Sequence, residues 1–176
     1  LTANTTANYN TAHGHKALKA NTTGAGNTAT GFVSLTANTT GSYNSGHGSE
    51  TLYSNTTGAN NTASGVQALY FNTTASYNTA TGYRSLFYNT TGASNTAVGW
   101  YSLFSNTTGG NNVAIGTSAL QDATTSVGNT AIGTSAGANV TTGTGENVMV
   151  GNRAGFGVTT GAQNIIIGDN ACANGT

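Results

Sequence analysis

Residues 106–122 read NTTGGNNVAIGTSALQD, and this stretch of 17 residues is one copy of a repeat that fills the chain. Its opening tripeptide, Asn-Thr-Thr, begins at residues 4, 21, 38, 55, 72, 89 and 106. The Thr-Thr pair continues in units that begin at 123, 140 and 158, with one inserted residue near Glu146. Ten tandem units predict stacked coils, because a short unit cannot bury its apolar face without neighbours.

Two more positions are invariant when the units are aligned with Asn4 as position one. Position seven is always Asn, which we expect at a corner, where Asn tolerates a left-handed backbone and its amide can bond to the next coil. Position eleven is always Gly, which predicts a positive φ or a backbone contact too close for a Cβ. These glycines are Gly14, Gly31, Gly48, Gly65, Gly82, Gly99, Gly116, Gly133, Gly151 and Gly168.

The apolar pattern predicts strands and disfavours helices. Segments such as 112–116, 147–151 and 164–168 are short β-formers bounded by turn residues. Position fourteen is small, and position fifteen is Leu in the first seven units, so both predict an inward stripe. We therefore expect one all-β domain over residues 1–176, a parallel β-solenoid (β-roll) of ten coils with two or three short strands each. The change of pattern after seven units predicts a boundary near residue 106 within one rod.

Composition excludes several functions. Four basic and four acidic residues give no net charge, so nothing favours nucleic acid or an anionic membrane as a partner. No apolar run is long enough for a membrane helix, and no signal peptide is visible. Because the chain begins within a repeat, we expect a mature product or part of a longer chain. The acids Glu50, Asp122, Glu146 and Asp169 are scattered, so we expect no catalysis and no cofactor.

The last units resemble a known family. Residues 112–119 (NVAIGTSA) and 129–136 (NTAIGTSA) are similar to the head repeat of YadA-type trimeric autotransporter adhesins and to repeats of bacteriophage tail fibres and bacterial surface fibres. The resemblance implies a left-handed parallel β-roll that assembles as a homotrimer. The family repeat is shorter than 17 residues, so a filament of end-to-end or laterally packed solenoids is the competing assembly.

Two kinds of chemical site are conceivable. His13 and His15 flank Gly14, and three copies around an axis would bring six imidazoles together, a set suited to a transition metal. The alternative is polar filling near an open end of the rod. The Asn-Thr-Thr motif also matches the N-glycosylation pattern, although a corner Asn before two β-formers gives the same sequence. The candidate glycosylation sites are Asn4, Asn21, Asn38, Asn55, Asn72, Asn89 and Asn106, with further matches at Asn60, Asn139 and Asn174.

An aromatic stripe occupies position sixteen in four consecutive units. It consists of Tyr53, Tyr70, Phe87 and Phe104, and Trp100 and Tyr101 lie nearby in the sequence. Two interpretations stay open: packing against a loop or a neighbouring chain, or an exposed platform for a sugar or another ligand. Ice binding is disfavoured, because adjacent Thr residues point to opposite faces of a strand and a Thr-x-Thr spacing would be needed.

We therefore expect a non-catalytic, extracellular structural or adhesive fibre module that self-associates into a homotrimer or filament. The alternative function is a receptor- or glycan-binding head of a phage tail fibre or adhesin. The expected partners of the chain are copies of itself and a host surface or glycan. We expect no nucleic-acid partner and no insertion into a membrane.

Overall fold

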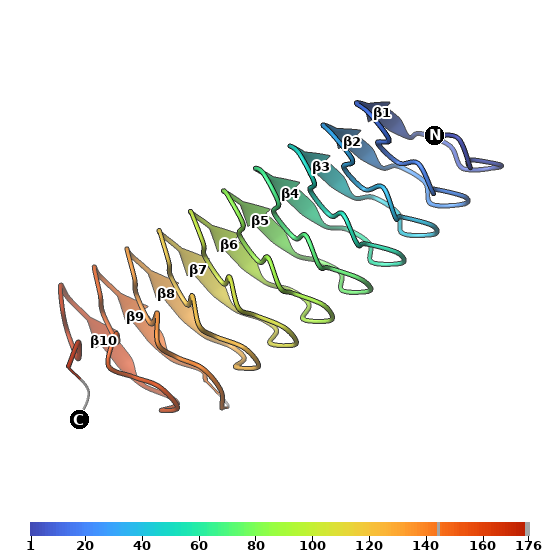
Figure 1. The fold of residues 1–176 in the computed structure, drawn as a ribbon. Coiled ribbons are helices and arrows are strands. Elements are labelled where there is room, and N and C mark those ends of the chain that lie inside the picture. Colours follow the sequence, from blue (N-terminus) through green and yellow to red (C-terminus); the bar gives the residue numbers. More distant parts are fainter. Residues whose placement is uncertain (144, 175–176) are drawn as a thin grey trace.

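The computed structural model describes residues 1–143 and 145–174, and within them the chain is an all-β solenoid (Figure 1). Each coil contributes one strand of three residues to a single ten-stranded parallel sheet. The strands are β1 (Thr11–His13), β2 (Thr28–Thr30), β3 (Ser45–His47), β4 (Thr62–Ser64), β5 (Thr79–Thr81), β6 (Thr96–Val98), β7 (Val113–Ile115), β8 (Thr130–Ile132), β9 (Val148–Val150) and β10 (Ile165–Ile167).

Neighbouring coils pair in register along the whole rod. Each strand pairs only with the strands before and after it, and Ala97, for example, lies opposite Ala114. Between β8 and β9 the offset is one residue longer, with Thr130 opposite Val148. The inserted residue therefore lies in the loop before β9 and leaves the sheet undisturbed. Thr144, in that loop, is outside the described residues.

The expected solenoid is confirmed, but the expectation of two or three strands in each coil is wrong. Four positions of every coil have a positive φ, which interrupts any longer extended run. In coil six these are Ser94, Gly99, Tyr101 and Leu103, at positions six, eleven, thirteen and fifteen. The left-handed residue at the corner is thus at position six. The invariant Asn at position seven has no positive φ, so our expectation of a left-handed backbone there is wrong.

The invariant Gly is required for both of the reasons that the sequence suggested. Gly99 has a φ of 135°, and a Cβ built on it would lie 2.5 Å from the carbonyl oxygen of Gly116 in the next coil. That distance is shorter than any real Cβ contact, and the atom it meets is backbone, which cannot rotate away. The same contact recurs from coil to coil, so Gly at position eleven sets how closely the coils stack.

The core is narrow and lies between the sheet and the turn that follows position eleven. In coils two to seven the middle residue of the strand, usually Ala, is buried and belongs to the same core as the Leu at position fifteen. The predicted inward stripe of Leu is confirmed, since all of its members are fully buried: Leu18, Leu35, Leu52, Leu69, Leu86, Leu103 and Leu120.

The Leu column stops at Leu120, and larger strand residues fill the space that it leaves. Gly137 and Gly155 replace Leu, and Met149 replaces the usual Ala in the middle of β9. A Cβ on Gly137 would lie 2.6 Å from Met149 Cε, and one on Gly155 would lie 2.5 Å from Met149 Sδ. The core volume is therefore conserved by exchange between two positions, which well-packed interiors tolerate best.

Two buried columns of Asn side chains connect the coils. In the first, at position one, Asn89 Nδ2 donates to Asn72 Oδ1 (2.9 Å) and to the carbonyl of Gly92 (2.9 Å). In the second, at position seven, Asn78 Nδ2 donates to the same Gly92 carbonyl (3.0 Å). Asn78 Oδ1 accepts the backbone N–H of Asn95 in the next coil (2.9 Å). Both columns thus meet at the position-four carbonyl.

The first Asn column ends where the sequence changes. Position one becomes Ala123, and the Oδ1 atom of Asn106 is buried without a hydrogen-bond partner. Among the described residues, only one other buried side-chain oxygen or nitrogen lacks a partner, the Ser126 hydroxyl. The boundary expected near residue 106 is therefore a break in one hydrogen-bonded column within a continuous sheet (Figure 1).

Candidate functional site

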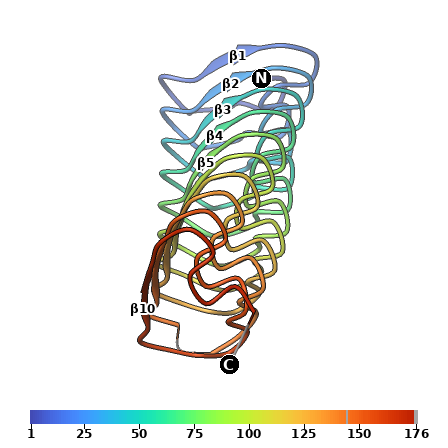
Figure 2. The same cartoon turned by 90° about the vertical axis from the view of Figure 1, so that its left-hand side faces the viewer.

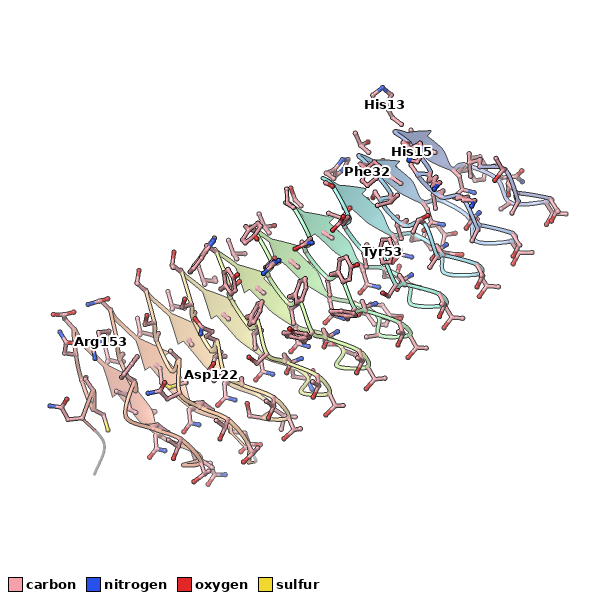
Figure 3. The ribbon with its side chains drawn as sticks, in the orientation of Figure 1. His13, His15, Phe32, Tyr53, Asp122 and Arg153 are labelled. Carbon is pink, nitrogen blue, oxygen red and sulfur yellow. The ribbon has the colours of Figure 1, made fainter. Side chains whose placement is uncertain are left out.

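Aromatic side chains gather on the turns that follow position eleven in coils three to six. We call this group the aromatic face, and Figure 3 labels Tyr53 at its first coil. It is formed by Tyr53, Tyr70, Phe71, Tyr83, Phe87, Tyr88, Trp100, Tyr101 and Phe104. It contains all six aromatic residues that the sequence singled out, together with Phe71, Tyr83 and Tyr88.

The rings of position sixteen stack on one another along the rod. Tyr53 and Tyr70 have centroids 4.9 Å apart, Tyr70 and Phe87 5.3 Å, and Phe87 and Phe104 5.4 Å. A parallel column is formed by Phe71 and Tyr88 (5.5 Å), which meet the first column edge to face. Such contacts contribute about 0.5–1.5 kcal/mol each beyond their area burial.

This stacking bears on the two interpretations that the sequence left open for the stripe. The flat ring faces are occupied by neighbouring rings of the same chain, and Phe87 is only 8% exposed. Sugars stack on ring faces, and rings inside a column, such as Phe87, have a neighbouring ring on both faces. The geometry therefore favours packing between coils of one chain over a sugar platform.

A polar column borders the aromatic face at position thirteen. Gln67 Nε2 donates to Glu50 Oε2 (2.6 Å), and Arg84 Nε donates to Gln67 Oε1 (2.6 Å). Arg84 Nη1 donates to Tyr101 Oη (3.1 Å), and the guanidinium also lies over the ring of Phe87 at 5.0 Å. These side chains bond to one another and leave no nucleophile beside a free base.

Electrostatics in this region are mild. The hydrogen bond to Tyr101 raises the pKa of Arg84, which is a cation at every ordinary pH. Burial, and then the nearby Glu50 carboxylate, raise the pKa of Tyr70 above 10.0. Neither group is thereby brought closer to titration at neutral pH. The aromatic face thus has the properties of a packed, weakly charged surface.

The two candidate metal ligands, His13 and His15, lie in different surroundings. His15 stacks on Phe32, with centroids 5.3 Å apart and rings 10° from parallel. His13 ends β1 and projects away from the rod (Figure 3). In the part of the chain that the structure describes, no three His, Cys, Asp or Glu residues are grouped to hold a metal ion. The six-imidazole site needs three copies and stays a prediction.

Six of the seven Asn-Thr-Thr asparagines have no room for a sugar. Asn21, Asn38, Asn55, Asn72, Asn89 and Asn106 are completely buried. From Asn38 onward, each amide nitrogen donates to the preceding Asn and to a position-four carbonyl, as Asn72 does to Asn55 (2.8 Å) and Ala75 (3.0 Å). A glycan on these nitrogens is incompatible with the fold. Asn4, in the first coil, is exposed.

The outer face of the sheet carries the Thr-x-Thr spacing that the Thr-Thr pairs lack. Positions eight and ten both point outward, as in Thr28 and Thr30 of β2 and Thr79 and Thr81 of β5. The strands of the last coils place Val and Ile at these positions. The coils also turn gradually about the rod axis, so β10 is rotated relative to β1 (Figure 2). A flat lattice such as ice would match few coils.

The structure also reveals surface residues that the sequence reasoning missed. Tyr9, Tyr43 and Tyr77 occupy position six in coils one, three and five, and their side chains are 88%, 66% and 66% exposed. A signal for them exists, because the pair Tyr-Asn recurs every 34 residues, at 9, 43 and 77, which is every second coil. A period of two coils is not visible when the units are compared one at a time.

Comparisons with known proteins do not assign the chain to a family. No protein-family model matches it, and neither a curated protein nor a solved structure is significantly similar to it. Within the described residues, no helix is long and apolar enough to cross a membrane.

Proposed function

We propose that the chain is a structural rod module of an extracellular fibre, in which further coils of the same fold stack on its ends. The supporting observation is that the terminal coils leave open the contacts that every internal coil makes. Within the described residues, the backbone N–H of Asn10 has no acceptor and Asn164 Oδ1 has no donor. Inside the rod these two groups bond to each other from coil to coil, as Asn27 N does to Asn10 Oδ1 (2.9 Å).

Apolar surface is also left uncovered at the two ends of the rod. Ile165 and Ile167 of β10 are 77% and 67% exposed, and a hollow of about 470 Å³ beside them is lined by Val158, Ile166 and Cys172. A second hollow, of about 230 Å³, opens at the first coil between Leu1 and Ala17. Unpaired strand edges are templates for pairing with another chain.

The two ends are different surfaces, so the contact that they favour is head to tail. A head-to-tail contact whose operation does not close into a ring generates an open filament. The fibre would carry load through the same hydrogen bonds that join the coils. Its extracellular location rests on the resemblance of residues 112–119 and 129–136 to surface-fibre repeats.

Electron microscopy of the purified chain, together with size-exclusion chromatography, tests this function. We expect filaments whose length increases with concentration, because each contact is bimolecular. Ile166→Lys, which places a charge in the open core of the last coil, should leave single rods. Ile132→Lys is the matched control on the outer sheet face and should still form filaments.

Two results would overturn the proposal. Single rods of the unmodified chain at high concentration would remove the basis for end-to-end stacking. Discrete trimers that Ile132→Lys dissociates and Ile166→Lys does not would show lateral assembly through the sheet in place of end-to-end stacking.

A further inference from the structure

Tyr9, Tyr43 and Tyr77, which we call the tyrosine row, have no evident role inside the chain. All three are exposed, and none makes an aromatic contact or a side-chain hydrogen bond with the described residues. Each also has a left-handed backbone, with φ of 61°, 57° and 63°, a conformation that is uncommon for bulky residues. Large apolar rings held outward on a regular scaffold are typical of a binding surface.

The spacing of the row is fixed by the solenoid. Adjacent parallel strands lie about 4.8 Å apart, so residues two coils apart are separated by about 9.6 Å along the rod. The intervening coils carry Gly26 and Asn60 at position six. Tyr43 leans across Gly26, where a Cβ would lie 2.7 Å from its ring. Unlike the rings of the aromatic face, those of the tyrosine row do not stack on one another, so ring surface is left for a ligand.

The surroundings of the row are polar and uncharged. Asn60 is exposed between Tyr43 and Tyr77, and its side-chain amide makes no hydrogen bond to the described residues. Position three carries an exposed Thr in each of these coils, such as Thr57 and Thr74. No Asp, Glu, Lys or Arg occurs at positions three, five or six of the first six coils. This combination of ring surfaces, amides and hydroxyls suits a neutral ligand rich in hydroxyl groups.

We propose that the tyrosine row binds a single extended chain of a neutral β-1,4-linked polysaccharide, either a glucan or chitin. In such a chain every second sugar presents the same face, and one disaccharide is close in length to two coils of this rod. Each Tyr would stack on every second pyranose, with Asn60 and the Thr hydroxyls bonding the sugar hydroxyls. The gradual rotation of the coils (Figure 2) suits one flexible chain better than a crystal face.

This inference goes beyond the rod function and does not require the rods to stack. It is therefore tested on single rods of the Ile166→Lys chain by calorimetric titration with hexasaccharides of β-1,4-linked glucose and of β-1,4-linked N-acetylglucosamine. We expect one of them to bind, and disaccharides to bind far more weakly because they span one ring. Tyr43→Ala should weaken binding roughly 3- to 10-fold, and replacement of all three tyrosines by Ala should abolish it.

Two matched variants test whether binding depends on the tyrosine row or is nonspecific. Tyr88→Ala removes an exposed tyrosine of the aromatic face and should leave affinity unchanged. The exchange variant Tyr43→Asn with Asn60→Tyr keeps the composition and three rings, but it breaks the two-coil spacing. Both positions have a φ of 57°, so the exchange should be accepted by the backbone. It should weaken binding as much as Tyr43→Ala does.

Three outcomes would overturn the proposal. They are absence of binding to both hexasaccharides, equal binding of an α-1,4-linked glucose hexasaccharide, and full affinity of the exchange variant. None of these bears on filament formation, which is measured separately, so the two proposals can fail independently.

Discussion

At the scale of single residues, the fold depends on positions with a left-handed backbone. Such a position can be predicted from the sequence only where it is occupied by Gly. Position eleven is always Gly and was predicted for the right reasons. Positions thirteen and fifteen are equally left-handed, yet they hold residues such as Arg84 (54°) and Leu86 (50°). No local propensity favours Leu there. Closing a 17-residue coil imposes these angles, and the contacts between coils maintain them, so they follow from the stack and not from the residue.

Replacing a position-eleven glycine should therefore be among the most damaging single changes. In Gly99→Ala the new Cβ meets the Gly116 carbonyl at 2.5 Å, and the φ of 135° is unfavourable for any side chain. We expect a loss of about 2–4 kcal/mol in the free energy of unfolding, measured by urea denaturation. Ser118→Gly is the control, because it relaxes a φ of 56°. It should be neutral or stabilising by up to about 1 kcal/mol.

The exchange of volume around Met149 makes a second prediction. Met149→Ala opens a cavity beside Gly137 and Gly155 and should cost about 2–4 kcal/mol. Gly155→Leu alone should also destabilise the chain, because its side chain would overlap Met149. The double variant restores the Ala and Leu pair of coil seven and should recover most of the loss. A thermodynamic cycle measures this coupling, and additive effects of the two changes would contradict it.

At the scale of one coil, the sequence predicts the element type but not its extent. The repeat period, the invariant Gly and the β-forming triplets were sufficient to predict a parallel solenoid and its inward Leu stripe. The number of strands was overestimated, because a polar stretch such as 106–111 can be a strand or a corner on composition alone. The buried role of position-one Asn was hidden for a related reason, since its partners are Asn residues 17 positions away and the same tripeptide is a glycosylation motif.

The structure of a single coil also determines where an extra residue can be inserted. Coil nine has its additional residue in the corner before β9. There Asn129 Nδ2 donates to Asn112 Oδ1 (3.2 Å) and to Val127 O (3.4 Å), and among the described residues it makes no bond to a position-four carbonyl of coil nine. One Gly inserted after Gly92, at the equivalent corner of coil six, should cost about 1–2 kcal/mol through such a weakened bond. Circular dichroism during thermal unfolding would measure it.

The same insertion after Ala97 gives the contrasting result. Inside β6 it would turn the following side chains to the other face of the sheet. We expect this variant to lose the cooperative transition of coils five to seven. Equal stability of the two insertion variants would show that register is not fixed by the strand.

For the whole molecule, the scarcity of charge predicts little response to pH until tyrosine ionises. The pKa of Tyr70 is raised in the folded chain, first by burial and then by Glu50. As pH rises above 10.0, the unfolded chain therefore loses this proton before the folded chain does. The stability from the neutral phenol is complete below that pH and is lost as pH approaches the raised pKa. Between about pH 9 and pH 11, Tyr70→Phe should lose less stability in urea than the unmodified chain, and an equal loss would contradict this.

The Asn columns also give the rod a direction. In both columns the Asn Oδ1 accepts from the next coil, as Asn72 does from Asn89 and Asn78 from Asn95, and the parallel strands have the same polarity. These accepting oxygens therefore all face the same end of the rod. An end-to-end assembly of such rods would be vectorial, with chemically different growing tips. Antiparallel end joints would place acceptor against acceptor, so a fibre built this way could not change direction along its length.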